Sequence, residues 1–267
     1  MQITRVDGSN PIDLASVDPS GTGDWTSKAA ARDALKSERD RIVALQERLY
    51  AEGRQSLLVV FQATDTGGKD GAIKKVFRGV NPQGCRVWNF GVPTEEELNH
   101  DFLWRYHYRT PGKGMIGVFN RSHYEDVLVV RVKGLAPPKV WEGRYEEIRE
   151  FEELLARNGT RILKFFLHIS RDEQRERLQA RLDDPEKHWK FRVGDLDDRA
   201  RWDDYQAAFQ DAVNKCATPE APWFVVPANR KWYRDVAVAR TVADALEEMN
   251  PQWPQEEPGL DKVVIPD

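Results

Sequence analysis

The stretch Leu57-Leu58-Val59-Val60-Phe61-Gln62-Ala63-Thr64-Asp65-Thr66-Gly67-Gly68-Lys69-Asp70-Gly71 decides the fold. Its first half is an apolar run without a breaker, which is typical of a strand buried on both faces of a parallel sheet. A paired-glycine turn and a lysine follow, and residues 72–77 then have helical spacing. Glycines let backbone N–H groups converge on an anion, while a helix N-terminus and a lysine add positive charge. The stretch therefore predicts a phosphate-binding loop, whose phosphate-binding residues are Thr66, Gly67, Gly68, Lys69 and Asp70.

This loop departs from the pattern G-x-x-x-x-G-K-[ST] of ordinary phosphate-binding loops. Ala63 stands where the first glycine belongs, and Asp70 replaces the hydroxyl residue that binds magnesium. Asp65 is an additional carboxylate inside the loop. Because a carboxylate offers the hard oxygen that Mg²⁺ prefers, we expect Asp65 to bind Mg²⁺, or Mn²⁺ in its place. The alternatives are that Asp65 only caps the following helix and that the glycine turn binds no phosphate.

Composition limits the classes of protein to which the chain can belong. At 267 residues, one large domain or a domain with an inserted subdomain is expected. The net charge of −4 argues against a nucleic-acid binder. Cys85 and Cys216 have neither metal-binding spacing nor a disulfide framework. No apolar run approaches the roughly 18 residues of a membrane span, and no secretory signal is visible. We therefore expect a cytoplasmic protein without nucleic-acid or membrane partners.

Apolar runs alternate with amphipathic segments along the chain. Strands are expected at 57–62, 85–90, 115–119, 162–169 and 223–226, and helices at 27–53, 72–79, 94–106, 127–132, 141–158, 170–185, 202–216 and, after the basic segment 229–234, through Leu246. This alternation predicts an α/β fold, a parallel sheet of about five strands with helices on both faces. Residues 1–23 are expected to form an irregular arm, 24–250 the domain with a lid at about 171–200, and 251–267 a proline-rich extended tail.

Polar and basic residues follow most of the predicted strands. In a parallel sheet the carboxyl ends of the strands meet at one edge, where ligands bind. That rule brings together residues 65–69, 91–94, 120–125, 171–181 and 229–234. Lys69 can hold one phosphate, Arg121 can reach the same region, and an arginine of the lid can clamp a transferring phosphoryl group. Alternatively, Arg177 and Arg181 only pair with acidic neighbours (Glu173, Asp183 or Asp184) on a solvated helix face.

Several motifs in order resemble the family-2 polyphosphate kinases. They are Phe61 to Lys74, Pro93-Thr94-Glu95-Glu96-Glu97, Phe102-Leu103-Trp104-Arg105, Gly117-Val118-Phe119-Asn120-Arg121-Ser122-His123-Tyr124-Glu125 and Asp184-Pro185-Glu186-Lys187-His188-Trp189-Lys190. The resemblance runs from about residue 30 to 250. It implies a three-layer α/β/α P-loop kinase fold with a helical lid, and magnesium-dependent phosphoryl transfer between inorganic polyphosphate and nucleotides. It also implies a homodimer or homotetramer.

The resemblance assigns roles to individual residues. It implies that Asp65, Lys69, Arg121 and Arg181 are catalytic, with Asn120 and Arg121 at the Walker B position and Arg177 as a second lid arginine. Much of the family has Asp where this chain has Asn120, so more of the metal binding should fall on Asp65. Asn120 together with Glu125 looks like the class III subgroup, which implies that both AMP and ADP are phosphorylated. GMP and GDP are further candidate acceptors.

Polyphosphate carries charge along its whole length and should need an extended basic track. The candidates for this track are Lys74, Lys75, Arg78, Arg105, Arg109, Lys113, Arg230, Lys231 and Arg234. Two rival functions remain open. One is an ATP-dependent nucleoside or nucleotide kinase of the thymidylate-kinase type, which the missing Ser or Thr after Lys69 disfavours. The other is a polyphosphate-binding protein that has lost catalysis, as Ala63 and Asn120 would suggest.

Overall fold

The centre of the fold is the predicted strand before the glycine turn. In the computed structural model, which describes residues 3–266, this strand is β2 (Ser56–Gln62). It lies in a six-stranded sheet with the order β1-β6-β5-β2-β4-β3. β2 pairs in parallel with β4 (Ile116–Asn120) and β5 (Thr160–His168), while β3 (Cys85–Asn89) and β6 (Trp223–Pro227) extend the parallel sheet on either side. The five predicted parallel strands are confirmed.

The sixth strand corrects the prediction of an irregular N-terminal arm. β1 (Thr4–Val6) pairs antiparallel with β6, so that Thr4 lies opposite Val225. A strand of three residues is too short to show an alternating pattern, and its signal is the open edge of β6 rather than its own sequence. The arm continues through the 3₁₀-helix η1 (Leu14–Ser16), where the Leu14 N–H donates to Gln210 Oε1 (2.7 Å). The arm is therefore part of the folded domain.

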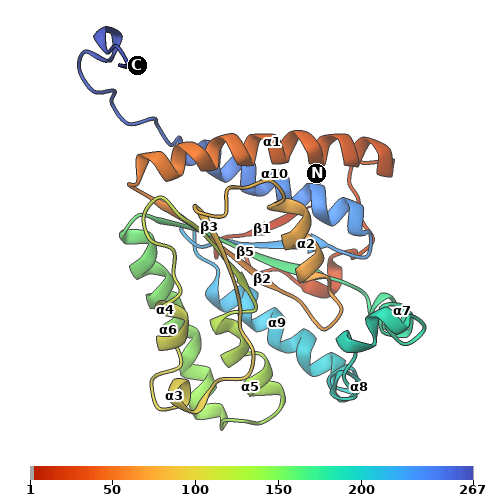
Figure 1. The fold of residues 1–267 in the computed structure, drawn as a ribbon. Coiled ribbons are helices and arrows are strands. Elements are labelled where there is room, and N and C mark those ends of the chain that lie inside the picture. The colour runs from red at the N-terminus through yellow and green to blue at the C-terminus, as the bar shows by residue number, and fades with distance from the viewer. Residues whose placement is uncertain (1–2, 267) are drawn as a thin grey trace.

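Helices cover both faces of the sheet, as predicted (Figure 1). One face carries α1 (Lys28–Glu52), α2 (Lys69–Val76) and α10 (Lys231–Met249). The other carries α5 (Val129–Val132), α6 (Pro138–Arg157) and α9 (Trp202–Cys216). Alternate residues of β2 enter two separate apolar cores: Leu57, Val59 and Phe61 face one, and Leu58 and Val60 the other. Burial on both faces explains the unbroken apolar run.

Some helix ends follow local sequence signals, and one predicted helix is interrupted by such a signal. Ser27 Oγ accepts a hydrogen bond from the Ala30 N–H at the start of α1, and Thr94 and Glu97 form a capping box. The predicted helix over 94–106 is wrong, because the segment forms two short helices, α3 (Glu95–Leu98) and α4 (Trp104–His107). Between them the Asp101 carboxylate accepts from the Leu103 N–H (3.0 Å), a local bond that competes with helix continuation.

The predicted lid segment forms a group of short helices. They are α7 (Arg171–Leu182), the 3₁₀-helix η3 (Pro185–Lys190) and α8 (Gly194–Ala200). α7 starts directly after β5, so this group lies beyond the carboxyl edge of the sheet (Figure 1). After α10 the tail leaves the body of the domain (Figure 1), and its described part includes the 3₁₀-helix η4 (Leu260–Lys262). Among the described residues, none of the helices has the length and apolar character needed to span a lipid bilayer.

Candidate active site

The loop between β2 and α2 is a tight turn that aims backbone donors at its mouth. The Gly67 N–H donates to Thr64 O (3.0 Å). Thr66 has a φ of +62° and Gly68, the N-cap of α2, a φ of +96°. Both angles lie in the left-handed region, which a β-branched residue such as threonine rarely adopts. No side chain caps α2 at Gly68, so the orphan N–H groups of its first turn remain free for an anion.

Ala63 fits the loop because the opposite residue is Gly67. A Cβ atom added to Gly67 would lie 2.4 Å from the Cβ of Ala63. The methyl group of Ala63 therefore fills the space that a side chain at position 67 would need. The departure from the usual glycine at the start of the loop is compatible with a closed phosphate-binding turn.

Lys69 lies at the start of α2 and folds back over the loop. Its ammonium group donates to the carbonyl of Ala63 (3.2 Å). Burial lowers the pKa of Lys69, and the nearby Arg121 guanidinium lowers it further, while Asp65 acts in the opposite direction. Two cations therefore converge on the loop mouth, where an anionic phosphate would stabilise both.

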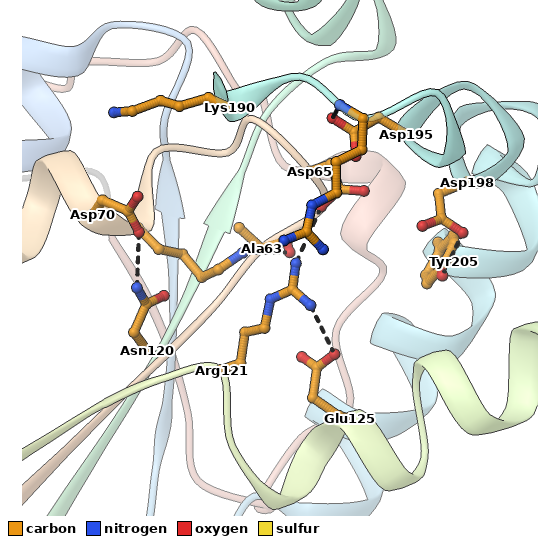
Figure 2. A network of polar contacts seen from close by, with 12 residues as sticks. Ala63, Asp65, Asp70, Asn120, Arg121, Glu125, Lys190, Asp195, Asp198 and Tyr205 are labelled. Carbon is orange, nitrogen blue, oxygen red and sulfur yellow. Dashed lines mark hydrogen bonds and ion pairs between the residues drawn. The ribbon is translucent and has the colours of Figure 1, made fainter. Parts of the chain in front are cut away.

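Arg121 follows β4 and reaches the same mouth. Its φ is +64°, and its N–H donates to the carbonyl of Phe61 on β2 (3.1 Å). Its guanidinium lies 3.5 Å from Asp65 Oδ1 and 3.8 Å from Glu125 Oε2 (Figure 2). Glu125 raises the pKa of Arg121, although burial opposes this. A non-glycine residue in the left-handed region is strained, and such strain is concentrated at functional sites.

Asn120, the last residue of β4, also contacts the loop. Its Nδ2 donates to Asp70 Oδ1 (2.7 Å) (Figure 2). Asp70 and Asn120, two of the residues that depart from the standard motifs, are thus hydrogen-bonded to each other, because an amide can donate where a carboxylate would repel. For a metal ion, the amide oxygen of Asn120 is the one atom of this side chain that could serve as a ligand.

Asp65 is the carboxylate best placed for a metal. It is 22% exposed, and the alternative that it caps α2 is wrong, because Gly68 occupies the N-cap. Among residues 3–266, no three His, Cys, Asp or Glu side chains are grouped closely enough to hold a metal. A Mg²⁺ ion here would therefore combine Asp65 with phosphate oxygens and water, and this mixed coordination is usual for magnesium at phosphate sites. The donor set fits the ion.

Arg177 braces the loop. Its guanidinium is buried and donates to the carbonyls of Thr66 (3.0 Å), Ala228 (2.6 Å) and Asn229 (3.1 Å). It also pairs with Glu173 (2.7 Å), as the plainer interpretation of this helix anticipated. With these donors engaged, Arg177 holds the backbone of the loop in place.

Arg181 points into the lid. Its Nη1 donates to the carbonyl of Lys190 (3.0 Å) and lies 3.6 Å from Asp195 Oδ2. Its expected pairing with Asp183 or Asp184 is not seen; the partner is on α8. Burial raises the pKa of Asp195 and the Asp65 carboxylate raises it further, so the lid and the loop mouth are electrostatically coupled.

Three acidic and phenolic groups of this region were missed from the sequence. Asp195, Asp198 and Tyr205 come from α8 and α9 and face the mouth of the loop (Figure 2). The Tyr205 hydroxyl donates to Asp198 (3.1 Å), which also pairs with Lys133 after α5 (2.7 Å). The three-residue spacing of Asp195 and Asp198, which puts both on one face of a helix, was the available signal.

Part of the predicted basic track gathers beside the loop. Arg234 is 2% exposed and bonded to Asp235, and its guanidinium packs against the loop. Burial lowers the pKa of Lys231, as do the neighbouring Arg177 and Arg234. Burial raises the pKa of Asp235, while the nearby Arg234 and Lys75 oppose this rise. The remaining exposed cations of this group are Lys74 on α2, Arg78 just after α2 and Arg230 just before α10.

Three other members of the predicted track lie elsewhere. Lys113 precedes β4, and the neighbouring Gly114 N–H donates to Gln55 before β2, so Lys113 is at the opposite edge of the sheet. Arg105 is buried, bonded to the Gly91 carbonyl (3.1 Å) and close to Glu97 (3.4 Å). Arg109 stacks on Trp88. The nine predicted cations therefore do not form a single track.

The close fit of the loop predicts a large effect for Gly68→Ala. A Cβ at this position would lie 2.1 Å from Nη1 of Arg234, and the φ of +96° disfavours any side chain. We expect a loss of about 1–3 kcal/mol of unfolding free energy from the backbone strain alone, with activity reduced further as Arg234 is displaced. Chemical denaturation measures the loss of unfolding free energy, and initial rates measure the loss of activity. Gly112→Ala, where a Cβ would meet nothing within 4 Å, is the control and should leave both unchanged.

The comparisons with known proteins agree with this geometry. The family model described as Polyphosphate kinase 2 (PPK2) matches residues 25–254. An AMP/ADP-polyphosphate phosphotransferase of Meiothermus ruber is 55% identical over 99% of this chain and 100% of its own length. An ADP-polyphosphate phosphotransferase of Rhodopseudomonas palustris is 42% identical over 98% of this chain and 94% of its own.

A solved structure supports the same assignment. The crystal structure of Polyphosphate Kinase 2 from Arthrobacter aurescens TC1 superimposes with a TM-score of 0.93 at 46% identity, covering 96% of this chain and 92% of that one. The family match covers most of the chain, from α1 to beyond α10, and includes the loop, Arg121 and the lid. The chain belongs to the polyphosphate kinase 2 family.

Proposed function

We propose that this protein transfers phosphoryl groups between inorganic polyphosphate and the adenine nucleotides AMP and ADP, forming ADP and ATP. The observation that carries the proposal is the convergence of Lys69, Arg121 and Asp65 on one loop mouth. A relative that aligns over its whole length is described as an AMP/ADP-polyphosphate phosphotransferase. Phosphoryl transfer needs positioned cations rather than covalent help, and this site supplies them.

Each residue of the mouth has a distinct task in the transfer. Lys69 and the free N–H groups at the start of α2, after the Gly67 turn, hold one phosphate of the donor. Arg121, aimed at the mouth between Asp65 and Glu125, contacts the transferring phosphoryl group and offsets its charge in the transition state. Arg181 is supplied by the lid, whose closure over the loop excludes water.

Asp65 would hold Mg²⁺, or Mn²⁺, beside the phosphates. The bound ion would neutralise charge on the phosphate oxygens and orient them for in-line transfer. Asp65 also keeps Arg121 directed at the mouth through their 3.5 Å contact. Asn120, engaged with Asp70, contributes at most its amide oxygen.

The polyphosphate chain would follow the cations next to the loop. They are Lys74 and Lys75 of α2, Arg78 just after α2, Arg230 just before α10 and Lys231 at its start; α10 packs against α2. Buried Arg234 and Arg177 support the loop beneath this path, and we assign Arg105, Arg109 and Lys113 no part in it. An anionic polymer gains from such a row of charges within an otherwise acidic protein.

The acceptor nucleotide would lie on the other side of the mouth, near Asn120 and Glu125. This pair is the basis for proposing that both AMP and ADP are acceptors, with GMP and GDP as a further class. A homodimer or homotetramer and a cytoplasmic location stay predictions.

A donor–acceptor matrix tests the function. Polyphosphate and ATP are each combined with AMP, ADP, GMP and GDP, with Mg²⁺ and with a chelator. We expect ATP from polyphosphate with either AMP or ADP, and none after chelation. Transfer from ATP alone would support a thymidylate-kinase-type enzyme, and polyphosphate binding without turnover would support a non-catalytic binding protein.

A further inference from the structure

Behind the active site, a buried ion pair joins α6 to β5. We propose that this pair, Glu152 and Lys164, together with His123 and Tyr124, positions Arg121 for the reaction. The inference rests on the function proposed above, because it concerns how the same site is held. None of these four residues contacts the loop mouth, so they are positioning residues rather than catalytic ones.

Lys164 lies in the middle of β5 and is 0% exposed. Its ammonium group donates to Glu152 Oε2 (2.5 Å), to the Cys216 carbonyl (2.7 Å) and to the Tyr124 hydroxyl (2.9 Å). All three of its protons therefore have acceptors. No donor of this buried ammonium group is left unsatisfied.

Glu152 on α6 connects this lysine to the segment after β4. Its Oε1 accepts from the Tyr124 hydroxyl (2.9 Å) and lies 3.0 Å from His123 Nε2. Burial pushes the pKa of Glu152 upward, but Lys164 and His123 more than offset this, and it lies below the ordinary value. Burial lowers the pKa of His123, although Glu152 opposes the shift. The cluster is thus one cation and one anion held by neutral groups.

The position of His123 and Tyr124 in the chain gives the cluster its role. They follow Arg121 by two and three residues, at the start of the 3₁₀-helix η2 (His123–Asp126). The left-handed φ of Arg121 is an unfavourable conformation that persists only where its surroundings hold it.

Contacts on both sides of Arg121 provide that hold. On the near side, the Arg121 N–H bonds to Phe61 on β2, and Ser122 Oγ accepts from Gln62 Nε2 (3.1 Å). On the far side, Glu152 fixes the side chains of His123 and Tyr124. Arg121 is therefore held by contacts of its own backbone and Ser122 with β2, and by contacts of the two residues after Ser122 with Glu152. These contacts direct its guanidinium at the mouth.

Stability alone does not explain a charged pair at this depth. Well-packed apolar residues of similar volume often stabilise a core as much as a buried ion pair does. A hydrogen-bonded pair fixes direction as well as distance, which an apolar contact does not. This difference matters here because a misplacement of about 1 Å in a reacting group can cost roughly 100-fold in rate.

The first test compares variants that cut the tether with one that only weakens the core. Tyr124→Phe and His123→Phe keep a ring in place but remove its hydrogen bond to Glu152. Val213→Ala removes buried volume from the same apolar core but alters none of the hydrogen-bonding side chains of the cluster. At a temperature where all variants are folded, we expect kcat to fall roughly 10-fold or more for the double tether variant, with KM within about threefold. Val213→Ala should retain the wild-type kcat. Equal kcat losses in the double tether variant and in Val213→Ala would overturn the proposal.

The second test asks whether the tether acts through Arg121. In a double-mutant cycle, the tether variants are combined with Arg121→Lys, which keeps a charge but loses the planar fork. We expect the effects to be non-additive: once the arginine is replaced, cutting the tether should change kcat less than twofold. Losses that multiply would show that the cluster acts independently of Arg121, and would overturn the proposal.

A third measurement does not depend on activity. Amide hydrogen exchange of residues 120–126 should become faster in Tyr124→Phe and His123→Phe, but not in Val213→Ala. Unchanged exchange would overturn the tether. If the wild-type protein forms no ATP from polyphosphate, the proposed function fails, and the exchange result still decides whether the cluster holds this turn.

Discussion

Replacing Lys69 with alanine should reduce ATP formation from ADP and polyphosphate by roughly 10²–10³-fold, the usual cost of removing one preorganised charge donor in a water-poor site. Lys69 is the cation at the start of α2, and its ammonium already lies over the loop, 3.2 Å from the Ala63 carbonyl. Its removal leaves no other lysine at the first turn of α2. Initial rates over a range of polyphosphate concentrations measure the loss in kcat and in kcat/KM.

Two further variants separate charge from position. Lys69→Arg keeps the positive charge but replaces a compact ammonium with a planar fork, which does not fit against Ala63, so most of the loss should remain. Lys36→Ala, an exposed lysine of α1 far from the loop in the sequence, should keep the wild-type rate. Full activity in Lys69→Ala would show that the loop does not hold the donor.

The parts of the fold that were predictable are those set by local patterns. The five parallel strands carry apolar runs, and the helices predicted to begin at residues 27, 94 and 170 start there because Ser27, Thr94 and Ser170 are their N-caps. β1 was missed because its three residues are ordered by the open edge of β6. The break between α3 and α4 was missed because Asp101 bonds the Leu103 N–H in competition with the helix, which helical spacing does not reveal.

The site was predictable where topology alone determines position. Asp65, Lys69 and Arg121 meet because β2 and β4 are parallel neighbours whose carboxyl ends lie together. The same rule excludes Lys113, which precedes its strand. Side-chain direction was not predictable. Arginines are usually exposed, but tertiary contacts bury Arg105, Arg177 and Arg234. Lys164 likewise gives no signal within β5, since its partners come from distant segments.

Asp65→Asn should reduce kcat by roughly 100-fold or more and raise the Mg²⁺ concentration needed for half-maximal rate, because an amide oxygen is a weaker ligand than a carboxylate. The fold should tolerate the change. Asp65 is partly exposed, caps no helix, and its ion pair with Arg121 is loose at 3.5 Å. Exposed Asp172→Asn on α7 is the matched control and should retain both the rate and the Mg²⁺ dependence.

The Mg²⁺ titration of Asp65→Asn separates two roles that the geometry gives to this carboxylate. Asp65 can bind the metal, and it also contacts Arg121. If Asp65 acts mainly as a metal ligand, the lost rate should return in part at high Mg²⁺. Mn²⁺, which tolerates nitrogen and amide ligands better, should restore more of the rate. If the carboxylate mainly directs Arg121, the rate should fall equally at every Mg²⁺ concentration and should not respond to Mn²⁺. The first outcome would mean that the loop binds its metal through Asp65 because position 70 carries a carboxylate bonded to Asn120 instead of the usual hydroxyl.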